Sequence, residues 1–550
     1  MRHFEWHDRR ASGRRHRGID RVIGLFMLGV MVHSSFSNPS TAQTESGGVQ
    51  QTAPQRTPPP ALQLSATERE FKLSLEDTIR LAVQNNLDIE RERLGPQIAQ
   101  TQVEQARAVF DPSVGLTASL AQTKTLPQNQ SLQFDQDGQI TGQTIIKPFN
   151  KTAAVTPSFK QRIVTGSSYE LSFINLRDLT SPANFGTTRR ITNPRHESAL
   201  ALTFTQPLLK DFGIAVNTAP LRQAQNAEGI AQQRLLKVIL DTVFAAQEGY
   251  WNLVLRVQDL VARRESQKLA EDFLAENTIR VELGSLAPIE LVQAETQVKV
   301  RQGEVISAAA AVREAEDKLK ETLNLPETMG TWRIRLLPTD SPSFVPVAEI
   351  DIDQKIAFAL QHRPDIRQAQ LDIASKEIAR DVARHQRLPQ LDLESKASVG
   401  GFSNDAASAA ANISDADGYN WAFTMRFAYP LGNRAAKSEL HRQQLLLQQS
   451  LIDQRKVQRT AAREIFQTAR DLETASQRVE VTRATTVLAR TQLEAEQEKF
   501  RLGLSTSFNV LQFQSQLTTA RSEETQALSA YNVALSRLDL VTGTIQHGLQ

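Results

Sequence analysis

The sequence of 550 residues contains no cysteine. Disulfide bonds, thiolate metal sites and cysteine nucleophiles are therefore excluded, and so is a lipid attached to an N-terminal cysteine. An exported chain of this length can bury a core large enough to be stable without disulfide bonds. Any attachment to a membrane must come from the fold itself.

Long apolar stretches are also absent. After residue 42 the chain has no run of about eighteen consecutive apolar residues, the minimum for a helix that crosses a bilayer. Backbone polar groups in lipid must be satisfied internally, so the membrane structure open to this chain is a closed β-barrel.

The motifs of enzymatic chemistry are missing as well. The sequence has no HExxH, no phosphate-binding loop, no GxSxG and no dinucleotide fingerprint. After residue 42 it has five histidines without ligand spacing, among which His362 is expected to cap or turn a helix. Met329 and Met425 are the methionines that remain there, too few for a relay of copper ions. We expect no enzymatic activity, no cofactor and no metal.

Residues 1–42 have the anatomy of a secretory signal, with seven arginines, an apolar run at 22–32 and small residues up to Ala42. The run is about half the ~20 residues of a spanning helix, so a membrane anchor is the weaker alternative. Without this leader the net charge is −2, and no clustered basic face remains to bind nucleic acid. Residues 43–70 are rich in Pro, Gln and Thr and predict an extended linker.

Three segments of the remaining chain occur twice, in the same order. LSLEDTIRLAVQNNLDI matches IDIDQKIAFALQHRPDI without gaps, LALTFTQPL matches FTMRFAYPL, and VELGSLAPIELVQ matches FRLGLSTSFNVLQ. This pattern predicts an internal duplication. The matched pairs are 73–89 with 350–366, 200–208 with 423–431, and 281–293 with 500–512.

Each copy is predicted to hold short helices, strands and a long helical hairpin. Apolar residues three and four apart predict helices over 217–281 and 434–500, about 97 and 100 Å long. The return helices, 289–320 and 508–540, reach only about 50 Å, so helices at 94–109 and 365–387 are expected to stack on them end to end. The predicted boundaries are 71–330 for repeat 1, with strands at about 112–207 and a hairpin at about 217–323, and 350–543 for repeat 2, with strands at about 389–430 and a hairpin at about 434–540.

Strands are predicted where large apolar and small or polar residues alternate, as in 200–205 and 421–429. In a barrel the large residues would face lipid and the small polar ones a wet lumen. A soluble sandwich would alternate equally well, and only a few strands are predicted per copy. A barrel therefore requires several chains to close it together.

These motifs, in this order, make residues 73–543 resemble the TolC family of outer-membrane efflux proteins. The specific marks are HRPDI at 362–366, TQPLLKDFG at 205–213, YPLGNR at 429–434, and the turns LGSLAPIELVQA and LGLSTSFNVLQ. The resemblance implies an α+β membrane protein, a homotrimer whose chains share one antiparallel β-barrel in outer-membrane lipid. A long α-helical coiled-coil barrel continues it as a periplasmic tunnel.

The implied function is that of the exit duct of a tripartite efflux or type I secretion system, conducting solutes passively through a gate at the periplasmic tip. Its partners would be a periplasmic adaptor (membrane-fusion) protein and an inner-membrane transporter, which mainly selects the cargo, whether drug, protein or metal. The family usually contributes four strands per chain. Here 112–207 is more than twice as long as 389–430, and extra strands are expected at 158–164 and 169–174, which would enlarge either the barrel or its external loops.

The two turns between the long helices are the candidate docking site. Gly284 and Gly503 follow the long helices, where a left-handed residue is favourable for glycine, and Ser285 or the cluster 505–507 can cap the return helices. This structural role explains the glycines by itself. Because the family docks its adaptor on these tips, the resemblance adds a docking role for Leu283, Gly284, Ser285, Leu286, Leu502, Gly503, Leu504 and Ser505.

The candidate gate departs from the family, which commonly has two aspartates just beyond the second tip. This chain has Asn509 and Gln512 there, with Glu290 and Gln293 at the matching places of the first repeat. Three Glu290 carboxylates could form a ring, and a ring with amides would respond less to pH and cations than one of carboxylates alone. Glu290 is equally explained as a first-turn acid favoured by the helix dipole.

Two other functions fit parts of the sequence. A secreted soluble coiled-coil scaffold would share the long helices but has no need of lipid-facing alternation. A periplasmic hydrolase would need a nucleophile, a base and an orienting group, and no such grouping is found. Extraction separates scaffold from channel, because a scaffold is released by salt and a barrel only by detergent.

Overall fold

A computed structural model describes residues 70–124, 130–134, 137–145, 149–181, 184–185, 188–189, 193–284, 287–325, 331–346, 350–416 and 418–544. These residues belong to one compact unit, Ala66–Gln550. The expected signal sequence at 1–42 and nearly all of the expected linker lie outside the described residues.

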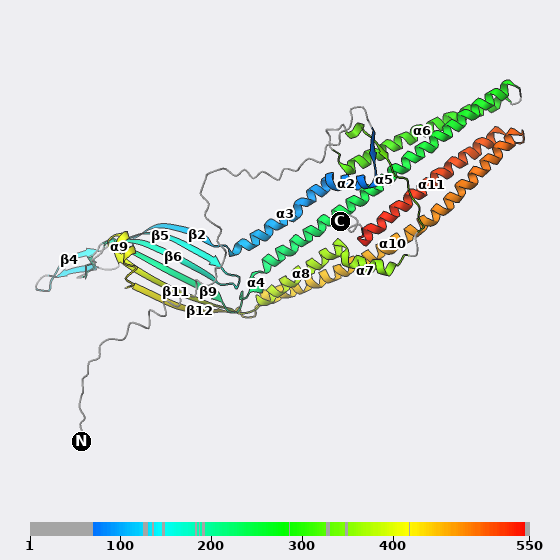
Figure 1. Ribbon diagram of the computed structural model, residues 1–550. Helices are drawn as coiled ribbons and strands as arrows, with labels where there is room; N and C mark the ends of the chain where they lie inside the picture. The colour runs from blue at the N-terminus through cyan, green and yellow to red at the C-terminus, as the bar shows by residue number, and fades with distance from the viewer. Residues whose placement is uncertain are drawn as a thin grey trace, which may run out of the picture. The chain divides into compact units, whose positions relative to one another are not determined.

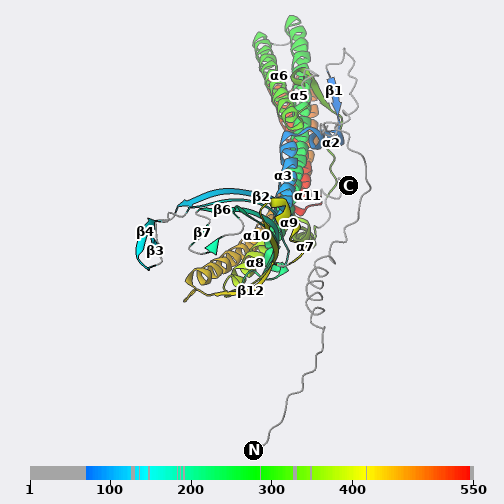
Figure 2. The same ribbon diagram turned by 90° about the vertical axis from the view of Figure 1, so that its left-hand side faces the viewer.

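One antiparallel sheet of six strands is the largest β-structure (Figure 1). Its order is β12-β11-β9-β6-β5-β2, and Figure 2 shows it curving between the edge strands β2 and β12. The sequence expected extra strands at 158–164 and 169–174, and β5 and β6 lie there, each longer than expected. The bounds are β2 Ser113–Lys124, β5 Phe149–Arg162, β6 Ser168–Ser181, β9 Arg195–Pro207, β11 Gln390–Ser403 and β12 Gly418–Ala428.

Three smaller pairings accompany the sheet. β3 (Gln130–Phe134) pairs with β4 (Ile140–Ile145), and β7 (Asn184–Phe185) with β8 (Thr188–Arg189), both antiparallel. β1 (Glu70–Leu73) pairs in parallel with β10 (Arg335–Pro338) beside the helices. The short helices are η1 (Ala108–Phe110), α4 (Ile214–Asn217), η3 (Thr331–Arg333) and α9 (Ala406–Ala411).

Two helical hairpins run from the sheet end of the unit to the opposite end (Figure 1). The first is α5 (Ala219–Glu282) with α6 (Pro288–Leu323), and the second is α10 (Arg434–Arg501) with α11 (Ser507–Thr542). With 64 and 68 residues, the long helices span about 96 and 102 Å. In the described part of the chain no helix combines the length and hydropathy needed to cross a membrane.

Two of the four shorter helices, α3 (Leu87–Arg107) and α8 (Pro364–His385), extend the return helices, as the sequence predicts. The other two are α2 (Leu75–Asn85) and α7 (Ile352–His362). The side chain of Asn86, just before α3, donates a hydrogen bond to the carbonyl of Thr322 in α6 (3.0 Å). The repeat-equivalent Arg363, just before α8, donates to the carbonyl of Val541 in α11 (3.1 Å). Each arm of a hairpin is therefore nearly continuous.

The sequence predicted that helix α3 starts at Leu94, and this start is wrong. Helix α3 begins at Leu87, because the Asn86 side chain accepts hydrogen bonds from the backbone N–H groups of Asp88 (2.9 Å) and Ile89 (3.2 Å). These bonds satisfy N–H groups that a helix start leaves open. Pro96 therefore lies inside the helix.

The apolar stripes of the long helices form the core. Val510, Leu517, Tyr531 and Leu538 of α11 are buried, and they belong to two clusters that include residues of α10. Most apolar residues of α5 that follow the three-and-four spacing, such as Leu240, Val243 and Leu253, are also buried, but Val261 is 49% exposed. The helix–helix packing that the three-and-four spacing predicts is therefore confirmed where α10 packs against α11.

Tyr250 fastens the β1–β10 segment to α5. Its ring is fully buried, its hydroxyl donates to Oδ2 of Asp340 (2.7 Å), and the same hydroxyl accepts from the backbone N–H of Asp340 (3.1 Å). Asp340 Oδ2 also accepts from the N–H of Leu75, the first residue of α2 (2.7 Å). Burial, with the hydrogen bond to Asp340, raises the pKa of Tyr250 from 10.0 to about 12.

We expect Tyr250→Phe to lower the free energy of unfolding by about 1–3 kcal/mol, because Asp340 loses a buried partner. A pKa raised from 10.0 to about 12 means that the phenol's contribution is complete below pH 10 and is lost as pH rises toward 12. Denaturant titrations in detergent, at neutral pH and above pH 10, measure the difference. Tyr419→Phe, at a tyrosine that is 65% exposed, is the matched control. Equal stability of Tyr250→Phe and wild type would contradict this account.

Candidate docking and gating site

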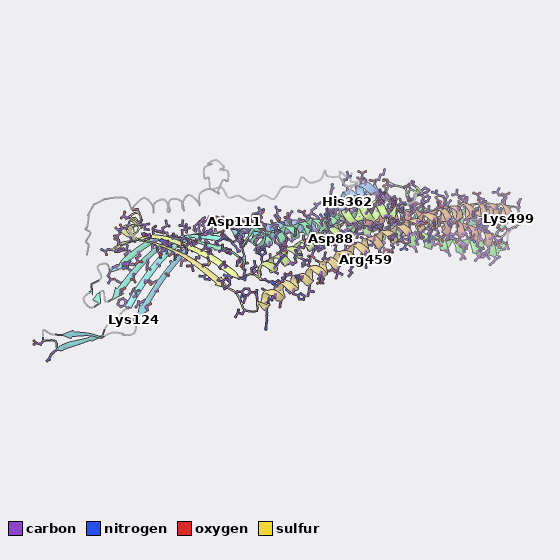
Figure 3. All side chains as sticks on the ribbon, turned by 90° about the horizontal axis from the view of Figure 1, so that it is seen from below. Asp88, Asp111, Lys124, His362, Arg459 and Lys499 are labelled. Atoms are coloured by element: carbon purple, nitrogen blue, oxygen red, sulfur yellow. The ribbon has the colours of Figure 1, made fainter. Side chains whose placement is uncertain are left out.

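The two turns between the long helices lie at the end of the unit farthest from the sheet (Figure 1). Figure 3 shows Lys499, near the end of α10, close to these turns, and Lys124, the last residue of β2, toward the other end. The first turn joins α5 to α6 and the second joins α10 to α11. The site is therefore built from helix ends.

Both turns contain the left-handed glycine that the sequence predicts. Gly284 and Gly503 each have φ of 72°, and a Cβ at either position would meet no atom within 4 Å. The requirement is therefore conformational and not steric. At the second turn the N–H of Leu504 donates to the carbonyl of Lys499 (2.9 Å), which satisfies a carbonyl at the end of the helix.

The predicted caps differ between the two return helices. Thr506 is the N-cap of α11, and its hydroxyl accepts from the N–H of Asn509 (3.4 Å), within the cluster that the sequence indicated. The N-cap of α6 is Ala287, which has no polar side chain, so the expected serine cap is wrong there. Pro288 at the first helical position lacks an N–H, which reduces the need for a cap. Ser285 and Leu286 lie outside the described residues.

The tips expose more apolar surface than the sequence indicated. Leu283, Leu502 and Leu504 are 76%, 65% and 76% exposed. Ile289 and Phe508, each in the first turn of a return helix, are 59% and 62% exposed. Sequence reasoning missed these two, although ungapped alignment of the two turns places them at equivalent positions.

Close to the tips the two hairpins contact each other. The side chain of Asn277 in α5 donates to the hydroxyl of Ser507, the first residue of α11 (3.1 Å). The rings of Phe273 and Phe500 have centroids 5.3 Å apart, and the guanidinium of Arg280 lies 4.8 Å from the centroid of the Phe500 ring. Sequence reasoning missed these contacts, because they join helices far apart in the chain.

The second tip also has a polar network around Ser505. Its hydroxyl donates to Oε1 of Glu496 (2.5 Å) and accepts from Nδ2 of the gate candidate Asn509 (3.3 Å). The hydrogen bond from Ser505 is the main cause that lowers the pKa of Glu496, followed by the one from Lys499. Glu496 therefore stays ionised and holds the docking residue Ser505 to α10.

The other gate candidates lie on the first turns of the return helices. Glu290 is half-buried, and its Oε2 atom has no hydrogen-bond partner within the described residues. Gln293 and Gln512 are exposed. No hydrogen bond among the described side chains joins Glu290 or Gln293 to Asn509 or Gln512.

The described residues contain no group of three or more His, Cys, Asp or Glu side chains that could hold a metal ion. His362 is the last residue of α7, where Nδ1 lies 2.9 Å from the carbonyl oxygen of Phe358 and the two rings stack. This is the helix-end position that the sequence predicts. Asp351 is the N-cap of α7, and its side chain accepts a hydrogen bond from the N–H of Gln354 (3.0 Å).

The comparisons with known proteins agree with this architecture. The model of the family described as Outer membrane efflux protein matches residues 356–544, which contain β11, β12 and the second hairpin. No curated protein sequence matches the chain.

Several solved structures are similar in fold. The CmeC outer membrane channel of Campylobacter jejuni is 16% identical, with a TM-score of 0.57 over 85% of each chain. The outer membrane protein VceC of Vibrio cholerae is 15% identical, with a TM-score of 0.58 over 85% of this chain and 96% of VceC. CusC is 15% identical, with a TM-score of 0.59 over 88% of this chain and 95% of CusC. The fold shared with these proteins is an antiparallel sheet continued by long helical hairpins.

We expect Gly503→Ala to loosen the second tip, because alanine at φ 72° is strained by about 1–2 kcal/mol. Hydrogen exchange of the amides at 498–504 should become faster. Gly303→Ala is the matched control, because Gly303 lies inside α6 with open space around its Cα, and alanine there should stabilise the helix by about 0.5–1 kcal/mol. Unchanged exchange in Gly503→Ala would show that the turn does not depend on this residue.

Proposed function

We propose that this chain belongs to the outer membrane efflux protein family and is the outer-membrane exit duct of an efflux or secretion system, with a periplasmic extension. It conducts solutes passively and catalyses no reaction. The family match of residues 356–544 and the channel fold support this function. Cargo would be selected mainly by the inner-membrane transporter.

The observation that carries the proposal is the two-sided sheet. Large apolar residues of β12, such as Trp421, Phe423 and Met425, alternate with small or polar ones and are each at least 64% exposed. A soluble scaffold has no use for such an apolar face, whereas a barrel wall requires it. Extraction of membranes tests this function. Release of the protein by salt without detergent would refute the assignment to the outer membrane.

Three chains are needed to build the duct, and the internal repeat indicates how they meet. Within one chain α5 packs on α8, where Gln223 and Asn226 donate hydrogen bonds to Ser375 (3.4 and 3.1 Å). A Cβ on Gly229 would lie 3.0 Å from Cδ1 of Leu371, so the two helices are close. This contact joins the first repeat to the second.

The same contact can form between chains, because α3 is equivalent to α8 and α10 to α5. Leu94 and Ile98 of α3 occupy the places of the α8 residues just named, and they are 53% and 58% exposed. On the corresponding face of α10, Leu445 and Ile452 are 51% and 59% exposed. Packing α10 of one chain on α3 of the next buries both apolar faces and gives a closed ring.

We expect Leu94→Asp combined with Ile98→Asp to dissociate the trimer, because each buried apolar side chain contributes about 1.5–3 kcal/mol per interface. Native mass spectrometry of the detergent-extracted protein measures the trimer fraction. Gln100→Asp, exposed on another face of the same helix, should leave it unchanged. A double variant that remains trimeric would refute this interface.

The exposed tips are proposed to dock the periplasmic adaptor. Their leucines lie at the ends of the long helices, and the neighbouring Ile289 and Phe508 enlarge the exposed apolar patch. A patch of this kind on a helix end fits an apolar partner surface. Docking would involve Leu283–Leu286 and Leu502–Ser505.

We expect Leu504→Glu to abolish export, because a charge would be buried in the adaptor contact. Trimers should still form in the outer membrane, and crosslinking in cells should show less adaptor bound. Trp332→Glu, at a residue that is 63% exposed on η3, is the control. Normal export by Leu504→Glu would remove this tip from the docking site.

The gate is proposed to lie on the first turns of the return helices, at Glu290, Gln293, Asn509 and Gln512. Asn509 is already held by Ser505, and the buried Oε2 atom of Glu290 has no hydrogen-bond partner within the described residues. Three carboxylates together with amides make a ring that responds to cations mainly through Glu290.

We expect Glu290→Gln to weaken block of the channel by divalent cations, because the ring would lose its carboxylates. Single-channel recordings across a series of cation concentrations measure the change. Glu282→Gln, at the exposed last residue of α5, is the control. An identical response to cations in wild type and Glu290→Gln would exclude Glu290 from the gate.

A further inference from the structure

We propose that each chain contributes six strands to the barrel wall, so that three chains close an eighteen-stranded barrel. The hairpin β5–β6 is then an insertion in the wall itself and not an external loop. This inference rests on the proposed function, and it concerns the width of the duct where it crosses the membrane.

The internal repeat identifies β5–β6 as the insertion. Strand β11 follows α8 as β2 follows α3, and Gln390 of β11 is repeat-equivalent to Ser113 of β2. In the second repeat β11 pairs directly with β12. In the first repeat the equivalent strands β2 and β9 are separated by β5 and β6, which lie between them in the sheet.

The insertion is bonded to the sheet on both sides along its length. β2 and β5 pair from Ser113↔Lys160 to Lys124↔Phe149, and β6 and β9 pair from Ser168↔Thr205 to Asp178↔Arg195. β5 and β6 pair with each other from Phe149↔Ser181 to Arg162↔Ser168. A hairpin that lay outside the barrel wall would leave the outer edge of β5 or of β6 without a paired strand.

Each face of the sheet also continues across the insertion. One row of directly paired residues crosses all six strands and is apolar throughout, while the next row points to the opposite face and is mostly polar or charged. Their chemistry is that of a lipid-facing and a lumen-facing row. The apolar row is Val114, Phe159, Leu171, Leu202, Ala397 and Trp421, and the polar row is Ser113, Lys160, Glu170, Thr203, Lys396 and Ala422.

The two edges of the sheet fit a second copy of this chain. Neither β2 nor β12 has a second partner among the described strands. Because six antiparallel strands alternate in direction, β12 of one chain runs antiparallel to β2 of the next. The edge strands have 12 and 11 residues, so their lengths match. Head-to-tail pairing of three copies leaves no free edge.

An eighteen-stranded wall has a physical consequence for transport. Barrel diameter grows roughly linearly with strand number, so the membrane part would be about 1.5 times as wide as one built from four strands per chain. Barrels of this size leave an aqueous channel. The membrane part would then be wide, and passage would be limited by the helical tunnel and its tip.

A single-cysteine scan of the full chain tests the position of the hairpin, because the sequence has no cysteine of its own. A membrane-impermeant maleimide should label Lys160→Cys and Glu170→Cys in proteoliposomes at least about tenfold faster than Phe159→Cys and Leu171→Cys. Lys396→Cys and Trp421→Cys in β11 and β12 are the reference pair. Equal labelling within β5–β6, with the contrast kept in the reference pair, would overturn the inference and leave the proposed function intact. Loss of the contrast in the reference pair would overturn both.

A deletion gives a second readout. Residues 149 and 181 are paired neighbours, so removing 149–181 keeps the direction of every other strand. Polymer exclusion from the outer side of the channel should show a pore about one third narrower. Removing β3–β4 (130–145), which lies outside the sheet, is the control and should leave the width unchanged. An unchanged width after removal of 149–181 would refute the insertion, and if that variant does not fold, the cysteine scan decides.

Discussion

The unpaired edges of the six-stranded sheet are the constraint on which the rest of the structure depends. Each edge carries a row of backbone N–H and C=O groups, and in lipid every such group without a partner costs several kcal/mol. The apolar face that includes Trp421 requires lipid, and the open edges require more strands. The proposed assembly with other copies would satisfy both requirements at once.

The helices continue the structure from the sheet into the aqueous compartment. Each short helix before a strand, α3 or α8, stands on the end of a return helix and is fixed there by Asn86 or Arg363. In the proposed assembly the hairpins therefore continue the barrel as a tunnel. The turns at the end of this tunnel are then the candidate site of docking and gating. There the glycine turns, the exposed leucines and the Ser505 network provide a rigid apolar surface beside polar first turns.

The sequence predicted the parts governed by local patterns. The bounds of α10 follow from helical periodicity and Gly503, and the alternation in β12 follows from a period of two. The end-to-end stacking of α3 and α8 on the return helices was predicted from helix lengths, but individual side-chain contacts between distant segments were not. Tyr250 with Asp340 and Asn277 with Ser507 depend on which helices become neighbours, and no local pattern encodes that. The docking and gating residues came from a family resemblance, and their roles remain proposals.

A structure of the protein extracted from the membrane in detergent tests the central claim most directly. The account predicts a threefold ring in which β12 of each chain pairs with β2 of the next, around one water-filled passage that runs from the sheet to the helix tips. A single chain whose β2 and β12 edges remain unpaired, without a central passage, would contradict it.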